Sequence, residues 1–241
     1  SLNIQNAKCN KRALIVFWLW LFFMVAFRHE LIGNDTLGYK SIFQFIVDSN
    51  WTTAINRSAE FGYSFLNKLI SLFTDDFRWL LIVSAFLSIY FVARAYIKYS
   101  SDAILTIALF VTMSNFIMLF SGIRQAIAIS LGMLAFEFTR NKKIIAFIIV
   151  TLIAITFHTS AFMIAFMYPL YHVKLKRKYL IFVIPLLGIV WIFNQPIFTF
   201  LGSFLSRFTD YNTDITLTGS VTMLILFLIF TVFAYLVPDE S

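Results

Sequence analysis

Cysteine, glycine and charge are all scarce in this 241-residue sequence. Cys9 is the single cysteine, which excludes a disulfide framework and a thiolate metal cluster. Glycine occurs eight times and never in a nucleotide-binding loop pattern. Charged residues make up 13% of the chain, against about 25% in a typical soluble domain. The three histidines are not spaced as zinc ligands, so we expect neither a metal site nor a cofactor.

Apolar residues fill the chain instead. They account for 60% of it, including thirty Phe, and the mean hydropathy is +0.84. A soluble domain of this size cannot hide so much apolar surface, so we expect lipid as its solvent. Backbone groups in lipid must be satisfied within the chain, and the predicted fold is therefore all-α and polytopic. The chain begins in a polar stretch and ends four residues after its last apolar run, so we also expect a fragment of a longer membrane protein.

The apolar runs predict seven or eight spanning or half-spanning helices in a single transmembrane domain over residues 1–241. Several runs are shorter than the roughly 20 residues of a straight crossing, which indicates tilted or half-buried helices. The predicted spans are residues 13–27, 77–97, 103–120, 123–139, 144–157, 160–172, 180–194 and 219–237.

Basic residues set the orientation, because Lys and Arg favour the cytoplasmic side of a bilayer. Four basic clusters lie an even number of crossings apart, so one orientation places all of them inside. The inner side then carries twelve Lys and Arg with four acids, whereas the outer side carries seven with eight. The net charge of +7 is therefore a topology signal that favours anionic lipids, and we expect no nucleic-acid binding. The four clusters are residues 8–12, 94–98, 140–143 and 174–178.

This orientation leaves two long loops outside, residues 28–76 and 195–218. The first loop holds two apolar stretches that are too short to cross, residues 36–47 and 61–73, and we expect interfacial helices there. The sequence Gly-Asn-Asp-Thr precedes the first stretch and predicts a turn and a helix start, with Asp35 or the following Thr as cap. In the simplest interpretation Asp35 is only a cap, and the nearby Arg28 only reaches the headgroups.

Residues 121–125, Ser-Gly-Ile-Arg-Gln, give a sharper signal. The chain has just emerged outside and turns back into a helix whose N-terminus faces the outer interface. Free backbone amides and the positive helix end favour an anion there. Arg124 in the first turn opposes the helix dipole and makes sense beside a bound phosphate. The alternative is an arginine that only extends to the interface.

His158 lies at a predicted outward turn between two short helices, with Ser160 as the expected cap of the second. It is either a neutral imidazole bonded within the turn or a proton carrier and hydrogen-bond partner for sugar or phosphate. The last outer loop places Arg207 near Asp210 and Tyr211. Those residues either bind a glycan by stacking and hydrogen bonds or belong to an interface-anchoring helix.

The motifs in chain order resemble a known family. They are Arg28, Gly-Asn-Asp-Thr at 33–36 with Tyr39, Glu-Phe-Gly-Tyr at 60–63, Phe-Ser-Gly-Ile-Arg-Gln-Ala at 120–126 and Phe-His-Thr-Ser-Ala at 157–161. Together they are similar to the EpsG-like group of bacterial membrane proteins, which includes Wzy-type O-antigen and capsule polymerases. The resemblance runs from about residue 12 to 172 and weakens beyond.

This resemblance implies a metal-independent glycosyltransferase that polymerises polyprenyl-diphosphate-linked oligosaccharides at the outer face of the inner membrane. The product would be O-antigen, capsule or exopolysaccharide, and the partners would include a flippase and a chain-length regulator. We expect Arg124 with Gly122 and Gln125 to bind the diphosphate, assisted by Arg28 or Arg207. The base candidates are His158, Asp35, Glu30 and Glu60, and the glycan-binding candidates are Tyr39, Tyr63, Asp210 and Tyr211.

Three alternatives remain at this stage. A transporter of lipid-linked glycans predicts basic residues along a path through the membrane, but the candidate charged residues and His158 lie only at the outer face. A membrane acyltransferase predicts an Arg or His facing a cytoplasmic acyl donor, where the chain offers only loop Lys and Arg. An accessory subunit of polysaccharide export would use the long outer loop as a docking surface.

Overall fold

The computed structural model describes residues 10–56, 60–173 and 182–193, together with positions 225, 228, 229, 231 and 232. Every regular element within these ranges is a helix, which confirms the all-α class. The chain divides into two compact units, Ser1–His172 and Val173–Ser241. In the second unit, α11 (Val183–Ile192) falls within the predicted span 180–194. Most of the predicted span 219–237 and all of the predicted loop 195–218 lie outside the described residues.

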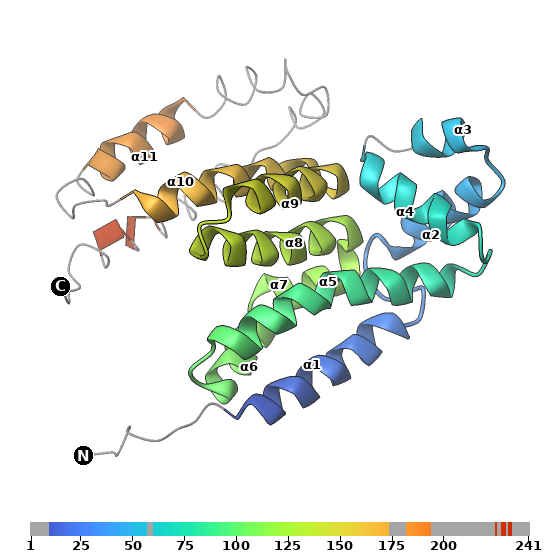
Figure 1. Ribbon diagram of the computed structural model, residues 1–241, viewed down its shortest axis with the longest axis horizontal. Coiled ribbons are helices and arrows are strands. Elements are labelled where there is room, and N and C mark those ends of the chain that lie inside the picture. The colour runs from blue at the N-terminus through green and yellow to red at the C-terminus, as the bar shows by residue number, and fades with distance from the viewer. Residues whose placement is uncertain are drawn as a thin grey trace. The chain divides into compact units, whose positions relative to one another are not determined.

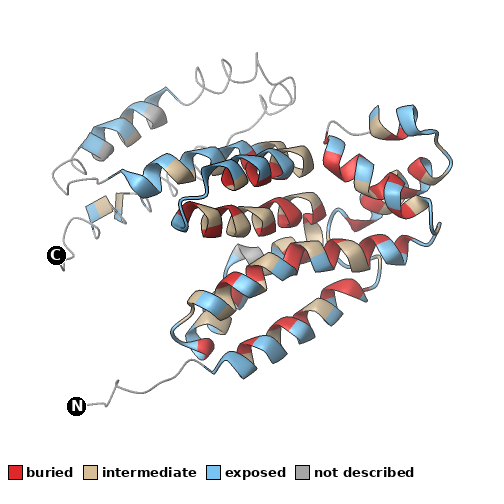
Figure 2. Ribbon diagram, in the orientation of Figure 1, coloured by how far each residue is buried: buried red, intermediate tan, exposed pale blue. Residues whose placement is uncertain are grey.

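Four helices make up the centre of the first unit (Figure 1). α5 (Phe77–Tyr99) packs against α1 (Lys11–Ala26) on one side and α8 (Ile123–Arg140) on the other. α8 in turn packs against α9 (Ile144–Phe157). The buried faces of α5 and α8 are turned toward their neighbours, as Figure 2 shows. These helices start and end close to the predicted spans, so the apolar runs located them well.

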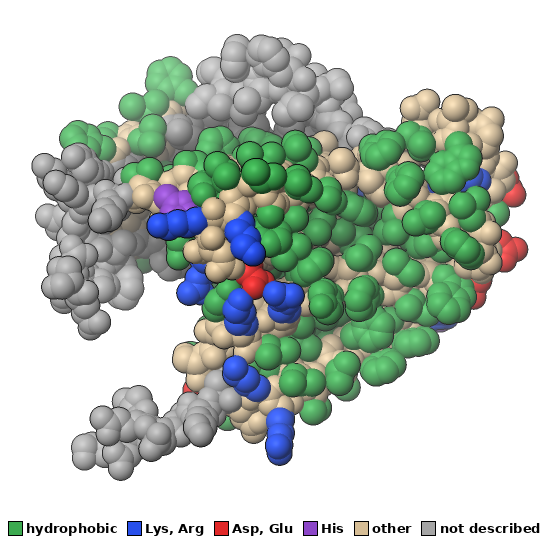
Figure 3. Space-filling view, viewed as in Figure 1, with side chains coloured by type: hydrophobic (Ala, Val, Ile, Leu, Met, Phe, Trp, Pro, Cys, Tyr) green, Lys and Arg blue, Asp and Glu red, His purple; other side chains and the backbone are tan. Residues whose placement is uncertain are grey.

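The face of the first unit seen in Figure 3 is broadly apolar, apart from a group of basic side chains. On α9, Ile145 is 74% exposed and Leu152 is 58% exposed, a distribution that suits contact with lipid. Among the described residues, α5 is the helix that is long and apolar enough to cross a membrane by length and composition. α9 and α6 (Ala103–Thr112) are apolar but shorter. Multiple crossings therefore stay a prediction.

The predicted span 103–120 is two helices. α6 ends at Thr112, Met113 is extended, and α7 covers Ser114–Ser121. The Thr112 hydroxyl donates to the carbonyl oxygen of Ala108 at 2.8 Å. Such side-chain bonds to the backbone compete with regular helix and bend it, which a hydropathy pattern does not register.

The predicted span 160–172 is also irregular. A 3₁₀ helix, η1 (Thr159–Phe166), leads into α10 (Met167–His172). The expected Ser160 cap is wrong, because the N-cap position belongs to His158 and no side chain caps η1. His158 is extended, so the predicted turn after Phe157 is present, and the next helix begins with its N-cap position two residues before the expected Ser160.

The first long loop folds into three short helices. α2 (Thr36–Val47) matches the predicted stretch, and α4 (Phe61–Ser71) ends two residues before the predicted one. α3 (Trp51–Asn56) was not expected from the sequence. Lys68 of α4 connects this helix to α2. Its Nζ donates to the carbonyl oxygen of Ile46 at the end of α2, at 3.2 Å, and to that of Ser49 in the following turn, at 2.6 Å. This buried lysine is therefore a structural tie within the loop.

Candidate active site

Two glycines bring the sequence motifs together. Gly33 has a φ of +96°, and a Cβ there would lie 1.9 Å from the carbonyl oxygen of Phe120. The loop before α2 thus lies directly on the turn between α7 and α8. The amide of Asn34 donates to the Ser121 hydroxyl at 3.3 Å, which joins the same two segments.

Gly62 likewise allows a close backbone contact, here between α4 and α9. A Cβ at this position would lie 2.3 Å from the Thr156 hydroxyl oxygen. The first turn of α4 therefore packs directly against the last turn of α9. This contact places Glu60, at the N-cap position of α4, beside His158, which follows α9.

Glu60 lies at the centre of the site, and its side chain is 0% exposed. One carboxylate oxygen lies 2.5 Å from an Nη of Arg124, and the other lies 2.9 Å from Nδ1 of His158. A buried carboxylate needs such partners, because the cost of removing it from water is large. We call these three residues the Glu60–Arg124–His158 cluster.

Arg124 is held from several sides. Its guanidinium lies 5.5 Å from the ring centre of Tyr39 and 5.8 Å from that of Tyr63, within cation–π range. The two rings meet edge to face at 5.4 Å. Nε of Arg124 is buried and has no hydrogen-bond partner among the described residues. The guanidinium is therefore held by Glu60 and by two aromatic rings.

The N-terminus of α8 adds backbone donors beside Arg124. Gly122 occupies the N-cap position, and no side chain caps this end of the helix. Gly122 is buried against Met118, where a Cβ would lie 2.4 Å from the sulfur. The following Gln125 is half-buried. Free amides at a helix N-terminus favour an anion, in line with the charge of Arg124.

Arg28 lies within electrostatic reach of Tyr39, whose ring contacts Arg124, and is only 4% exposed. One Nη donates to the carbonyl oxygen of Val25 at 2.9 Å, whereas Nε and the other Nη are buried with no partner among the described residues. Burial lowers the pKa of Arg28 to about 10, and Tyr39 acts in the opposite direction. The side chain is still a cation at neutral pH.

Glu30 and Asp35 are placed apart from the cluster. Glu30 pairs with Lys40 at 2.6 Å, and this hydrogen bond lowers the pKa of Glu30 below its usual value. The pair therefore favours the folded state above the ordinary carboxyl pKa, and that contribution fades as the pH falls through the lowered value. Asp35 is exposed at the N-cap position of α2 without a capping bond; the Thr36 hydroxyl donates to the Ile32 carbonyl instead.

The aromatic candidates are buried. Tyr39 is 4% exposed and Tyr63 is 0% exposed, and burial raises the pKa of each phenol. Their rings contact each other and Arg124 instead of opening to a wide surface. The remaining candidates, Arg207, Asp210 and Tyr211, lie outside the described residues.

The sequence did not indicate that Glu60 pairs directly with both Arg124 and His158. All three were candidates, but Arg124 was expected to bind a diphosphate and Glu60 to be a possible base. The position of Glu60 just before a glycine and a helix was the available signal. A group of three or more possible metal ligands does not occur within the described part of the chain.

The chain belongs to the EpsG family, whose sequence model matches residues 11–240. Members of this family are membrane proteins of the polysaccharide-polymerase type. The match runs to residue 240, beyond the residue 172 at which the resemblance was expected to weaken. Neither a curated protein nor a solved structure matches the chain.

Proposed function

We propose that the Glu60–Arg124–His158 cluster transfers a growing glycan from polyprenyl diphosphate to the sugar of a second lipid-linked repeat. The acceptor hydroxyl oxygen forms a bond to the anomeric carbon of the donor, and the bond from that carbon to the diphosphate breaks. The diphosphate leaves with the electron pair, and the hydroxyl proton passes to a base. The reaction takes place at the outer face of the inner membrane, where the charge distribution predicts the cluster to lie.

Arg124 is the group that stabilises the leaving diphosphate. A guanidinium has five N–H donors, so in this proposal the ion pair with Glu60 leaves donors for phosphate oxygens. The uncapped N-terminus of α8 adds amides at the same place, and the buried Arg28 adds a second cation. In this proposal, charge developing on the diphosphate meets fixed cationic side chains that need little reorganisation.

His158 is the proton acceptor. Its Nδ1 bonds to Glu60, so Nε2 is the nitrogen that can face the acceptor hydroxyl. The carboxylate fixes the orientation of the ring and stabilises the imidazolium that forms, as an acid does in a catalytic triad. Glu60 thereby acts as a positioning residue for the base and for the cation together.

The observation that carries the proposal is the fully buried Glu60 carboxylate, bonded on one side to a cation and on the other to an imidazole. That arrangement joins a leaving-group site to a base. A docking surface or an accessory subunit would not need it.

Turnover of a lipid-diphosphate-linked repeat by the purified full chain in vesicles tests these roles. We expect His158→Gln to lower kcat by about 10²- to 10⁴-fold with little change in KM. Arg124→Lys keeps the charge but loses the planar fork, and we expect it to lower kcat by about 10²-fold and to raise KM.

Lys40→Gln is the matched control, because it removes a cation from the same loop region without touching the cluster. It should retain turnover within about twofold. Full activity of both Arg124→Lys and Arg124→Gln would remove the diphosphate role from Arg124.

A further inference from the structure

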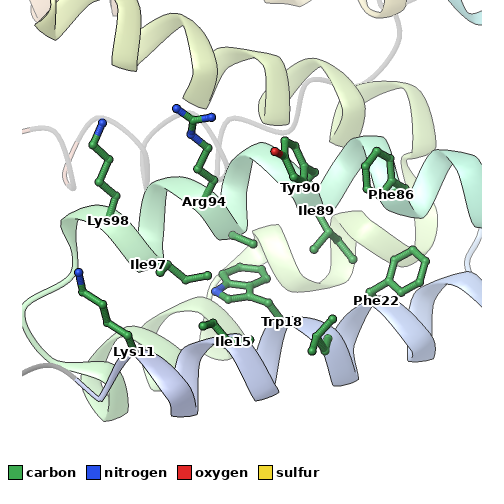
Figure 4. Close-up of a pocket in the computed structure, with 12 residues that line it drawn as sticks. Lys11, Ile15, Trp18, Phe22, Phe86, Ile89, Tyr90, Arg94, Ile97 and Lys98 are labelled. Carbon is green, nitrogen blue, oxygen red and sulfur yellow. The ribbon is translucent and has the colours of Figure 1, made fainter.

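A groove of about 670 Å³ runs between α1 and α5, away from the Glu60–Arg124–His158 cluster (Figure 4). Its walls are apolar over most of their length, with Ile15, Trp18 and Phe22 from α1 and Phe86 and Ile97 from α5. The size lies within the range of small-molecule sites, and the lining is suited to a hydrocarbon chain.

The chemistry of the groove changes from one end to the other. Lys11 at the start of α1 lies at the same end as Lys98 near the end of α5, while Phe22 and Phe86 lie at the other (Figure 4). From Lys11 to Phe22 the helix rises about 17 Å. That length is close to the roughly 15 Å depth of one leaflet of hydrocarbon, half of a bilayer core of about 30 Å. The groove thus has the dimensions of a lipid chain with its headgroup at the basic end.

The basic end carries more positive than negative charge. Glu137 of α8 pairs with Arg94 at 3.1 Å and with Lys98 at 2.6 Å. The side chains of Arg94 and Lys98 are still about half exposed, at 50% and 48%, so both can contact a further anion. Lys11 is exposed and has no acidic partner among the described residues. Three cations against one carboxylate leave two positive charges in excess.

Trp18 supplies a second and independent sign of a ligand. It is 3% exposed and lines the groove, yet its indole N–H has no hydrogen-bond partner among the described residues. A buried indole N–H is normally bonded. The nitrogen faces the basic end of the groove in Figure 4, where an ester carbonyl below a phosphate would accept it.

We propose that this groove is a binding site for an anionic phospholipid. The phosphate lies among Lys11, Arg94 and Lys98, an ester carbonyl accepts from the Trp18 indole, and one acyl chain follows the apolar walls. The inference does not depend on the proposed polymerase chemistry, because the two sites use different residues.

Titration of the purified full chain in detergent with phosphatidylglycerol, followed by native mass spectrometry, tests the site. Phosphatidylcholine with the same acyl chains is the neutral comparison. Each Lys or Arg near an anionic lipid contributes enough that the Lys11→Gln/Lys98→Gln variant should bind phosphatidylglycerol roughly 30-fold more weakly. Its binding of phosphatidylcholine should be unchanged.

Lys142→Gln/Lys143→Gln is the matched control, since it removes the same charge from the turn after α8 and does not line the groove. It should change phosphatidylglycerol binding by less than about threefold. Ala93→Phe fills the groove without changing its charge and should weaken binding of both lipids, with folding checked by circular dichroism. Equal losses from the two lysine pairs, or full binding by a folded Ala93→Phe variant, would overturn the proposal.

Discussion

Glu60 determines both the stability and the chemistry of the site at the level of single residues. Its carboxylate is out of contact with water, forms an ion pair with Arg124 and is hydrogen-bonded to His158. The Arg124 side chain is 27% exposed. The charge of Glu60 therefore needs its partner more than the charge of Arg124 does. Loss of the arginine strands a buried charge, whereas loss of the carboxylate leaves a cation that can still reach water.

We therefore predict unequal effects of two changes to glutamine. Arg124→Gln should lower the free energy of unfolding by roughly 3–5 kcal/mol, because Glu60 then remains buried without its cation. Glu60→Gln should cost about 1–2 kcal/mol, since Arg124 is partly exposed. Unfolding of the full chain in detergent micelles measures both.

The double variant Glu60→Gln/Arg124→Gln supplies the decisive comparison. It should be more stable than Arg124→Gln alone, because no uncompensated carboxylate remains. If the two single effects simply add, Glu60 and Arg124 are not an ion pair in the folded protein.

At the level of elements, close backbone contacts at glycines position the site. Gly33 allows the loop before α2 to lie on the turn that precedes α8, and Gly62 allows α4 to lie on the end of α9. The residues that meet in the cluster are far apart in sequence, since Glu60 and His158 differ by 98 in residue number. These contacts therefore decide whether the motifs form one site.

Gly33→Ala and Gly38→Ala should have opposite effects. Gly33 has a positive φ, and its added Cβ would meet the Phe120 carbonyl, a backbone atom that cannot move aside. We expect a loss of about 2–4 kcal/mol in the free energy of unfolding. Gly38 lies inside α2 with no atom within 4 Å of an added Cβ, so alanine there should stabilise the helix by up to about 1 kcal/mol.

Thermal unfolding of both variants in the same detergent measures this difference. A Gly33→Ala protein as stable as the wild type would show that the loop before α2 does not rest on Phe120.

The sequence predicted the elements that have a strong local signal. α2 and α8 begin where a small-residue turn precedes an apolar run, and α5 and α9 follow uninterrupted apolar segments. α3 was missed because six residues are too few to show helical periodicity. The break at Met113 was missed because it lies within a run that is apolar throughout, where a hydropathy pattern does not register the Thr112 side-chain bond to the backbone.

The members of the site were also predictable, but their partners were not. Charge at an outer interface singled out Arg124, Glu60 and His158 one at a time. Their pairing depends on how α4, α8 and α9 pack, and no local pattern records that packing. The same holds for Glu137. Its charge predicted only that it lies on the inner side of the membrane, whereas in the structure it pairs with Arg94 and Lys98.

For the whole molecule, α8 connects two regions of different charge. Arg124 stands at its first turn and Glu137 near its last, which separates them by about 20 Å along the axis. The basic cluster around Glu137 corresponds to the side that the charge rule predicts to be cytoplasmic. The Glu60–Arg124–His158 cluster lies at the opposite end of the helix, in agreement with the outward placement that the proposed reaction needs.

The most direct test of the central claim is glycan length on a gel, in a host that lacks its own polymerase and makes the cognate repeat. The full chain would be supplied as wild type, Glu60→Gln, Arg124→Gln or His158→Gln at matched membrane levels. Lys40→Gln and Asp75→Asn, exposed or partly exposed charges outside the cluster, serve as controls.

We predict a long ladder from the wild type and both controls, and single repeats from each of the three cluster variants. A ladder of normal length from Glu60→Gln and Arg124→Gln at matched levels would contradict the assignment of polymerisation to this cluster.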